Sequence, residues 1–152
     1  MTTIQFYHLT SSPLERALPR LVEKAYSAGF RVHLRVGTEA QADYFNTGLW
    51  TYDPNSFLPH GTAQDAAPEK QPVFISATAE APNQPDILVV TDGSQPAALD
   101  SYKRILDVFD GKDATAVETA RARWKQYKDQ GCEVAYFKQN DAGAWEKVAS
   151  NG

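Results

Sequence analysis

The sequence predicts a single α/β domain of three layers with a mostly parallel central sheet. Apolar segments with strand and helix periodicity alternate from the N-terminus onward, an order typical of parallel α/β folds. The segment 87–90, Ile-Leu-Val-Val, is apolar throughout, as expected of a central strand buried on both faces. The 152 residues show no internal repeat, low-complexity tract or domain boundary, so we expect one domain over residues 1–152.

The first part of the chain alternates two strands with two helices. Residues 4–9 are the first predicted strand, and residues 31–36 alternate with period two as a second strand. Residues 14–28 place leucine and valine on one helical face, and Gly29 follows as a C-terminal stop. A second helix is predicted over residues 39–49. This order favours parallel pairing of the two strands.

The second part of the chain contains the remaining predicted elements. Proline and glycine content indicates exposed loops over residues 61–72 and 81–85. The break between two late helices is placed near Gly111. The elements expected here are strands at 73–76, 87–90 and 133–138, helices at 98–109 and 114–129, and a last helical turn at 145–149.

Charge is distributed unevenly along the chain. The net charge of −4 argues against a protein that coats nucleic acid, because phosphate neutralisation needs a basic surface. Residues 61–120 carry four basic and ten acidic side chains, whereas residues 121–152 carry six basic and four acidic ones. A local positive site on an acidic body suits a small anionic ligand or an acidic peptide better than a long duplex.

Three kinds of segment or cross-link that would point away from the cytoplasm are not found in the sequence. The single cysteine, Cys132, rules out an intramolecular disulfide framework. No stretch approaches the roughly 20 apolar residues that span a bilayer. The N-terminus lacks the basic and apolar regions of a signal peptide. We therefore expect a cytoplasmic protein with no membrane contact.

The sequence lacks the motifs of a nucleotide-dependent enzyme. The turn at residues 8–13 contains no glycine, although a bound pyrophosphate needs glycines there for close backbone approach. Gly111 and Lys112 lack the other residues of a P-loop and are typical of a helix-breaking turn. Asp107 and Asp110 are expected to be solvated charges near helix ends. We therefore predict no catalytic residues and no nucleotide cofactor.

Metal binding and thiol chemistry have no support either. The histidines His8, His33 and His60 are widely spaced, and none forms a short ligand motif with Cys132. A buried or idle thiol is the simpler interpretation of the cysteine. We expect no metal site.

The segment 49–61 is rich in aromatic residues yet broken by prolines, so it is not expected to form one regular element. Large apolar groups in an irregular segment either tuck into the core or line a pocket. For Trp50 and Phe57 taken one at a time, the two interpretations are about equally favoured.

The predicted helix 114–129 carries the basic cluster. At 100° per residue its apolar stripe consists of Val117, Ala120, Trp124 and Tyr127. Its basic borders are Arg121, Lys125 and Lys128 on one side and Arg123 on the other. An ordinary amphipathic helix, whose basic side chains extend over the core, explains this pattern as well. Four positive charges within eight residues of an acidic chain nevertheless favour a binding site.

A surface of this kind can bind the end of an acidic peptide. An aromatic-walled pocket gains about 1.5–3 kcal/mol from one buried apolar side chain. An adjacent arginine holds a carboxylate with two parallel hydrogen bonds, and further lysines attract an acidic strand. The predicted ligand is an acidic peptide that ends in an aromatic residue with a free carboxylate. A ligand that small should bind at about micromolar strength.

Several segments together resemble the chi subunit family of bacterial DNA polymerase III. The combination is quite specific, whereas each piece alone is weak. In chain order the segments are Phe6-Tyr7-His8-Leu9, Gly29-Phe30-Arg31-Val32, Leu49-Trp50, Ser56-Phe57-Leu58-Pro59-His60, Gln71-Pro72-Val73 and Ala120-Arg121-Ala122-Arg123-Trp124-Lys125-Gln126-Tyr127. They extend over nearly the whole chain.

The resemblance implies an accessory subunit without catalytic activity. Its fold would be similar to Rossmann-type nucleotide-binding domains but without their phosphate-binding loop. Its partners would be the psi subunit, which tethers it to the clamp loader, and the acidic C-terminal tail of single-stranded DNA-binding protein, which ends in Pro-Phe. DNA would be contacted only indirectly.

The resemblance also implies the residues of the tail site. Trp50 and Phe57 would wall it, and Arg121 would bind the terminal carboxylate. Trp124, where the family often has tyrosine, and Lys125 would complete it. Val117 stands where well-known members have lysine, and Arg123 or Lys128 would have to compensate for that charge. Lys128 is therefore included among the predicted site residues.

Two other functions stay open from the sequence. The first is a nucleotide-dependent enzyme on the same fold, for which the turn at residues 8–13 is unsuited. The second is direct binding of single-stranded DNA, with Trp124 and Tyr127 as a stacking platform beside the basic residues. The acidic total of the chain disfavours this second function.

Overall fold

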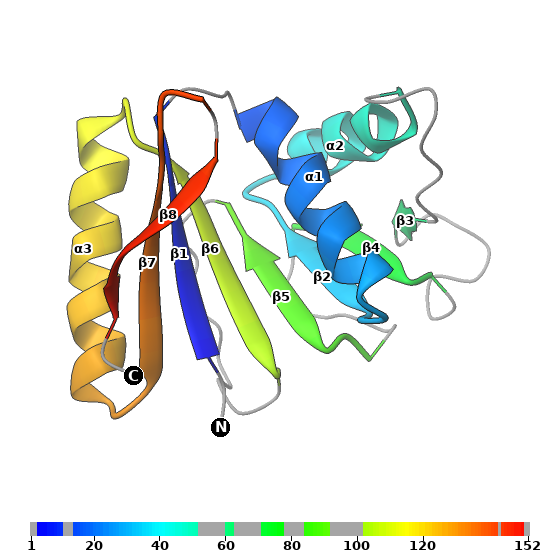
Figure 1. Ribbon diagram of the computed structural model, residues 1–152. Helices are drawn as coiled ribbons and strands as arrows, with labels where there is room; N and C mark the ends of the chain where they lie inside the picture. Colours follow the sequence, from blue (N-terminus) through cyan, green and yellow to red (C-terminus); the bar gives the residue numbers. More distant parts are fainter. Residues whose placement is uncertain are drawn as a thin grey trace.

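The computed structural model describes residues 3–10, 14–51, 60–62, 71–77, 84–91, 102–142 and 144–150. In this part of the chain, three helices accompany an eight-stranded sheet (Figure 1). The helices are α1 (Leu14–Ser27), α2 (Glu39–Thr51) and α3 (Ala114–Asp129). The strands are β1 (Thr3–Leu9), β2 (Val32–Arg35), β3 (His60–Thr62), β4 (Val73–Ser76), β5 (Ile87–Val90), β6 (Arg104–Asp110), β7 (Glu133–Gln139) and β8 (Trp145–Ser150).

The strands of the sheet are ordered β3-β4-β2-β5-β6-β1-β7-β8. Every described pair is parallel except β7 with β8, which is antiparallel. β1 lies between β6 and β7, with Thr3 opposite both Arg104 and Glu133. The predicted mostly parallel sheet is thus confirmed.

Helices cover both faces of the sheet, which gives three layers (Figure 1). The side chains of β1 alternate between the two faces, as the period of a strand requires. Ile4 and Phe6 pack in one core with residues of α3. Leu9 packs in the other core with residues of α1 and α2. Each fully buried side chain of this size contributes about 1.5–3 kcal/mol, so both layers stabilise the domain.

The predicted helix over residues 98–109 is wrong, because residues 104–109 belong to strand β6. Residues 98–101 lie outside the described residues. The five residues 105–109 are all buried, since β6 is paired on both sides and covered on both faces. The run is short and apolar except for Asp107, so it has no periodicity that separates a strand from a buried helix.

The predicted helical turn at 145–149 is also wrong, because these residues form β8. The backbone of Asn140 donates to the carbonyl of Ala144 at 2.8 Å, and the Asn140 side chain accepts from the amides of Ala142 and Ala144 at 3.0 Å. An asparagine that bonds the backbone ahead of it favours a tight turn. The chain therefore reverses, and β8 pairs with β7.

The other predicted elements differ only at their ends. α1 ends before Gly29, which has a φ of 93° that favours glycine, as the predicted stop requires. α2 runs two residues further than predicted, to Thr51. Gly61 and Thr62, predicted to be loop, pair with β4 as part of β3, while residues 63–70 and 81–83 lie outside the described residues.

Candidate functional site

Helix α3 is fixed at its start by a side-chain cap and at its inner face by the sheet. The Asp113 carboxylate accepts from the backbone amides of Thr115 and Ala116 at 3.0 and 3.3 Å, which satisfies two amides that the helix leaves free. The helix packs against β6, β1 and β7. Its buried residues are Ala120, Arg123 and Tyr127. Val117 and Trp124, predicted in the same stripe, are half-buried at the border of this core.

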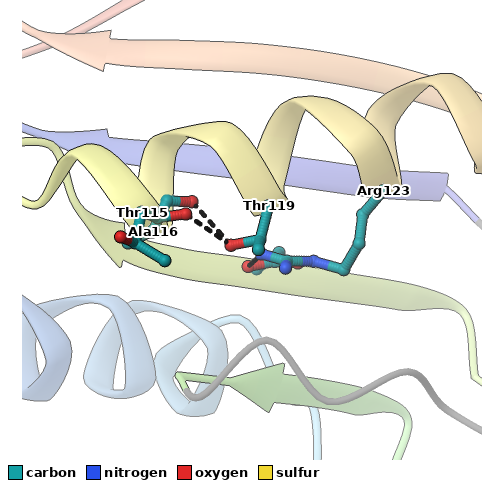
Figure 2. Close-up of polar contacts among 5 residues, drawn as sticks. Thr115, Ala116, Thr119 and Arg123 are labelled. Carbon is teal, nitrogen blue, oxygen red and sulfur yellow. Dashed lines mark hydrogen bonds and ion pairs between the residues drawn. The ribbon is translucent and has the colours of Figure 1, made fainter.

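Arg123 is neutralised inside the protein. Its Nε and Nη2 atoms donate to the two carboxylate oxygens of Asp107 at 2.7 and 3.0 Å. Arg123 is 6 % exposed and Asp107 is 1 % exposed. Figure 2 shows the Arg123 side chain directed from α3 toward the strand beneath the helix. Bidentate pairing of this kind is the strong form of an arginine–carboxylate contact.

This pair corrects two predictions. Asp107 is not a solvated charge near a helix end, because it lies in β6 and faces α3. Arg123 is not at a solvated border of the stripe, because it is buried. Since it is buried and its charge is paired with Asp107, Arg123 does not compensate for the charge that Val117 lacks.

A neighbouring threonine is hydrogen-bonded to the backbone of the same helix. The hydroxyl of Thr119 donates to the carbonyls of Thr115 and Ala116 at 2.9 and 3.1 Å (Figure 2). This back-bonding satisfies the hydroxyl within the helix. Thr119 lies one turn before Arg123, on the side of the helix that carries the buried ion pair.

The remaining cations of α3 face solvent. Arg121, Lys125 and Lys128 are exposed, and among the described residues none of them has an acidic partner within 4.0 Å. At about 100° per residue the three lie within roughly 60° of one another around the helix axis. Trp124 follows next around the helix and is half-buried. The structure therefore brings together these four predicted site residues on one helix.

Trp124 is held in place by aromatic neighbours from the sheet. Its ring lies 5.8 Å from that of Phe6 and 5.8 Å from that of Tyr136, the latter nearly perpendicular. Such tilted pairs contribute about 0.5–1.5 kcal/mol beyond area burial. Tyr127 is only 3 % exposed and packs on Phe6 as well. The Tyr127 ring is therefore not accessible to a base, and the stacking platform proposed for single-stranded DNA would have only the Trp124 ring.

The positive charge of Arg121 extends to the ends of β1 and β7. His8 Nδ1 and the Tyr136 hydroxyl are hydrogen-bonded at 2.6 Å. Burial, then Lys138 and Arg121, lower the pKa of His8, while Asp110 opposes them. Burial raises the pKa of Tyr136, and Arg121 opposes this. The sequence does not predict His8, Tyr136 or Lys138 in the site, because only the pairing of β1 with β7 brings them together.

The space beside His8 is closed by the turn after β6. The Gly111 amide donates to the Leu9 carbonyl at 2.7 Å. A Cβ atom added at Gly111 would clash with the His8 ring and with the Leu9 carbonyl, so only glycine fits here. An imidazole packed on a backbone turn here differs from the open glycine-lined turn that holds a pyrophosphate.

The helices that carry Trp50 and Arg121 lie on opposite faces of the sheet. Trp50 belongs to the last turns of α2, which contacts β3, β4 and α1 at one side of the sheet. α3 contacts β6, β1 and β7 on the opposite face (Figure 1). Phe57, the other predicted pocket wall, lies outside the described residues.

Metal-binding clusters and membrane-spanning helices are both absent from the described residues. No group of three or more His, Cys, Asp or Glu side chains is placed to hold a metal ion there. None of the described helices has the length and apolar character needed to cross a membrane.

Comparison with known proteins identifies the family. Residues 1–135 match the family model described as DNA polymerase III chi subunit, HolC. The probable DNA polymerase III subunit chi of Rickettsia prowazekii (strain Madrid E) is 28% identical over 98% of this chain and 93% of its own length. The DNA polymerase III subunit chi of Haemophilus influenzae (strain ATCC 51907 / DSM 11121 / KW20 / Rd) is 32% identical over 85% of this chain and 92% of its own. The chain thus belongs to the DNA polymerase III chi subunit family.

Proposed function

We propose that this chain is a non-catalytic accessory subunit of DNA polymerase III that binds the acidic C-terminal tail of single-stranded DNA-binding protein. In this proposal the chain links that protein to the clamp loader through the psi subunit. Family membership supports the place in replication, and the link to psi rests on the family resemblance alone. The observation that supports tail binding is the set of exposed cations on α3, Arg121, Lys125 and Lys128, next to the half-buried Trp124.

Arg121 is the residue assigned to the terminal carboxylate. Its side chain is exposed, and among the described residues no carboxylate lies within 4.0 Å of it. A guanidinium group in that state can bind a carboxylate through two parallel hydrogen bonds. Lys125 and Lys128 lie on the same side of the helix and would attract the acidic residues that precede the terminus.

Trp124 is assigned to the contact with the terminal phenylalanine. Phe6 and Tyr136 fix the Trp124 ring from below, and the ring is half-buried, so part of it faces solvent. An aromatic side chain that packs there would bury apolar area at about 25 cal/mol per Å². Positive charge beside a fixed aromatic ring is the arrangement that an acidic peptide ending in Pro-Phe requires.

Trp50 and Phe57 belong to the predicted site by resemblance. Because α2 and α3 cover opposite faces, we propose that the α3 residues alone supply the primary contact with the last residues of the tail. Trp50 would then contribute to a separate contact.

The proposal is tested by titrating the protein with a synthetic tail peptide in four forms. The forms are the full tail, the tail without its last phenylalanine, the tail with a C-terminal amide, and a scrambled peptide of equal charge. We expect about micromolar affinity for the full tail and at least tenfold weaker binding of the other three. Equal affinity for the acid and the amide would disprove the assigned role of Arg121.

A further inference from the structure

A groove lies on the face of the sheet opposite α3. It has a volume of about 560 Å³ and is lined by residues of α1, β1, β6 and β8. Figure 1 shows the arrangement of these four elements. This volume is within the range of about 300–1,000 Å³ that ligand pockets occupy. Four half-buried aromatic side chains line it: Phe30 after α1, Tyr7 from β1, Phe137 from β7 and Trp145 from β8.

The groove exists because one layer of the fold is incomplete here. α3 covers β6, β1 and β7 on its own face. On the other face, α1 contacts β2 and β6, and α2 contacts β3 and β4. In parallel α/β folds both faces of the sheet are normally covered. In the described chain, α1 and α2 leave Tyr7 of β1 and Phe137 of β7 only half-buried on this face.

The rim of the groove is positively charged. Arg20 and Lys24 lie one turn apart on α1, and Arg104 begins β6 on the other side. All three are exposed, and no aspartate or glutamate is among the described residues that line the groove. Arg104 also opposes the increase in pKa that burial causes at Tyr7, so its charge reaches the groove floor. Charge complementarity thus indicates an anionic partner.

The aromatic floor favours a polypeptide over nucleic acid. Tyr7 stacks on Phe137 with ring centroids 5.2 Å apart, and Trp145 meets Tyr7 nearly at right angles at 4.9 Å. Binding of single strands uses aromatic faces on which successive bases stack. Here the rings are packed against one another, which suits an aliphatic or aromatic side chain that fills the hollow between them.

We propose that this groove is a second docking site, which binds an acidic segment of a partner protein through an apolar side chain seated among Tyr7, Phe137 and Trp145. Arg20, Lys24 and Arg104 bind the flanking carboxylates. The site is separate from the tail site on α3, because the two lie on opposite faces of the sheet. The partner segment does not need to end in a free carboxylate. Cations on both sides of the hollow can bind acidic side chains before and after the apolar residue.

The test uses the full chain and a short peptide of aspartate and glutamate with a central leucine–phenylalanine pair. Both ends of the peptide are blocked, so it has no terminal carboxylate for Arg121. Titration is followed by amide NMR shifts and by fluorescence anisotropy. We expect shifts at Tyr7, Leu106 and Phe137. The double charge reversal R20E/K24E should weaken binding at least tenfold.

Arg16 provides the matched control, because it is exposed on α1 one turn before Arg20 and does not line the groove. R16E should change the affinity less than twofold and leave the melting temperature as in the parent. Equal loss in R16E and R20E/K24E would overturn the proposal, as would shifts confined to α3. A thymidine oligonucleotide that shifts the groove amides at lower concentration than the peptide would overturn the assigned partner. Failure of this test leaves binding of the free-acid tail to α3 unaffected, so the two proposals fail separately.

Discussion

The two faces of the sheet use their basic residues differently. On the α3 face, Arg123 is buried and paired with Asp107 at 2.7 Å, so its charge is not available to a partner protein. Arg121, two residues earlier on the same helix, is exposed. On the other face, Arg20 and Lys24 flank a groove that no described helix covers. The number of charges alone therefore says little about function, since burial and pairing decide which cations can bind a partner.

The difference between Arg121 and Arg123 follows from helix geometry. Two residues along a helix correspond to about 200° of rotation, so the two side chains point to opposite sides. The side of α3 that carries Arg123 packs on β6, where the Asp107 carboxylate lies. The side that carries Arg121 faces solvent. Substitutions at both positions, and at the other basic and aromatic residues of the two faces, can break or sharpen this contrast.

Arg123→Ala should cause the largest loss of stability. It removes the arginine that pairs with the buried Asp107 carboxylate, and breaking a buried ion pair costs about 3–5 kcal/mol. Arg121→Ala is the matched control and should change stability by less than about 0.5 kcal/mol, as expected for a surface site. Urea unfolding of both variants measures the difference. Equal losses of stability would show that the buried Arg123 contributes no more to stability than the exposed Arg121.

A buried base without an acidic partner should instead lose its charge. His33 is 0 % exposed and bonds Ser76 Oγ through Nε2 at 2.8 Å, while its Nδ1 has no partner among the described residues. Burial, then Arg35, lower the pKa of His33 to about 4. Since the unfolded value is about 6.5, protonation favours the unfolded state. The stability contributed by the neutral ring is complete above pH 6.5 and is lost as the pH falls toward 4.

We expect the free energy of unfolding to fall by about 2 kcal/mol between pH 7.5 and 4.5 from His33 alone. Denaturant unfolding at a series of pH values measures this, with His33→Gln as the comparison. The parent and the variant should differ in slope between pH 6.5 and 4.5. Parallel pH profiles would place the acid sensitivity elsewhere.

Arg121→Ala should weaken binding of the free-acid tail peptide by about 1.5–3 kcal/mol, the usual contribution of a hydrogen bond to a charged group. This corresponds to a roughly 10- to 150-fold increase in Kd. Lys112→Ala, which removes an exposed cation from the turn before α3, should leave Kd nearly unchanged. Calorimetric titration provides both values. An unchanged Kd in the Arg121 variant would exclude it from the site.

Trp50→Ala should have the smallest effect on tail affinity, below about 0.5 kcal/mol, because α2 packs on the other face of the sheet. Trp124→Ala should weaken the same peptide by at least about 1 kcal/mol through lost apolar contact. The same titration compares them. A loss of tenfold or more with Trp50→Ala would indicate that the aromatic segment reaches the tail after all.

Much of the fold could be predicted from local patterns. The strands β1, β2, β4, β5 and β7 and all three helices were predicted from apolar periodicity, caps and glycines. β6 was not, because Asp107 interrupts its buried run, which therefore shows neither the alternation of a half-buried strand nor the unbroken apolar character that predicted β5. β8 was not, because its identity depends on a turn at Asn140 and on the partner strand β7.

The candidate site could be predicted only in part, for a similar reason. Helical spacing correctly placed Arg121, Lys125 and Lys128 on one exposed side of α3. The burial of Arg123 depends on Asp107, 16 residues earlier, which lies beneath the helix only because β6 is a strand. Whether Trp50 and Arg121 share a face depends on the side of the sheet on which each helix crosses, and residue spacing contains no information about that.

The most direct test of tail binding at α3 is an amide NMR titration of the full chain with the free-acid tail peptide. We expect the shift changes to concentrate in Arg121–Lys128 of α3 and at His8 and Tyr136, which lie within the field of Arg121. The amides of α1 and of the groove should remain unshifted. Shift changes centred on α2 or on the groove, with α3 unaffected, would contradict the assignment of the tail site to α3.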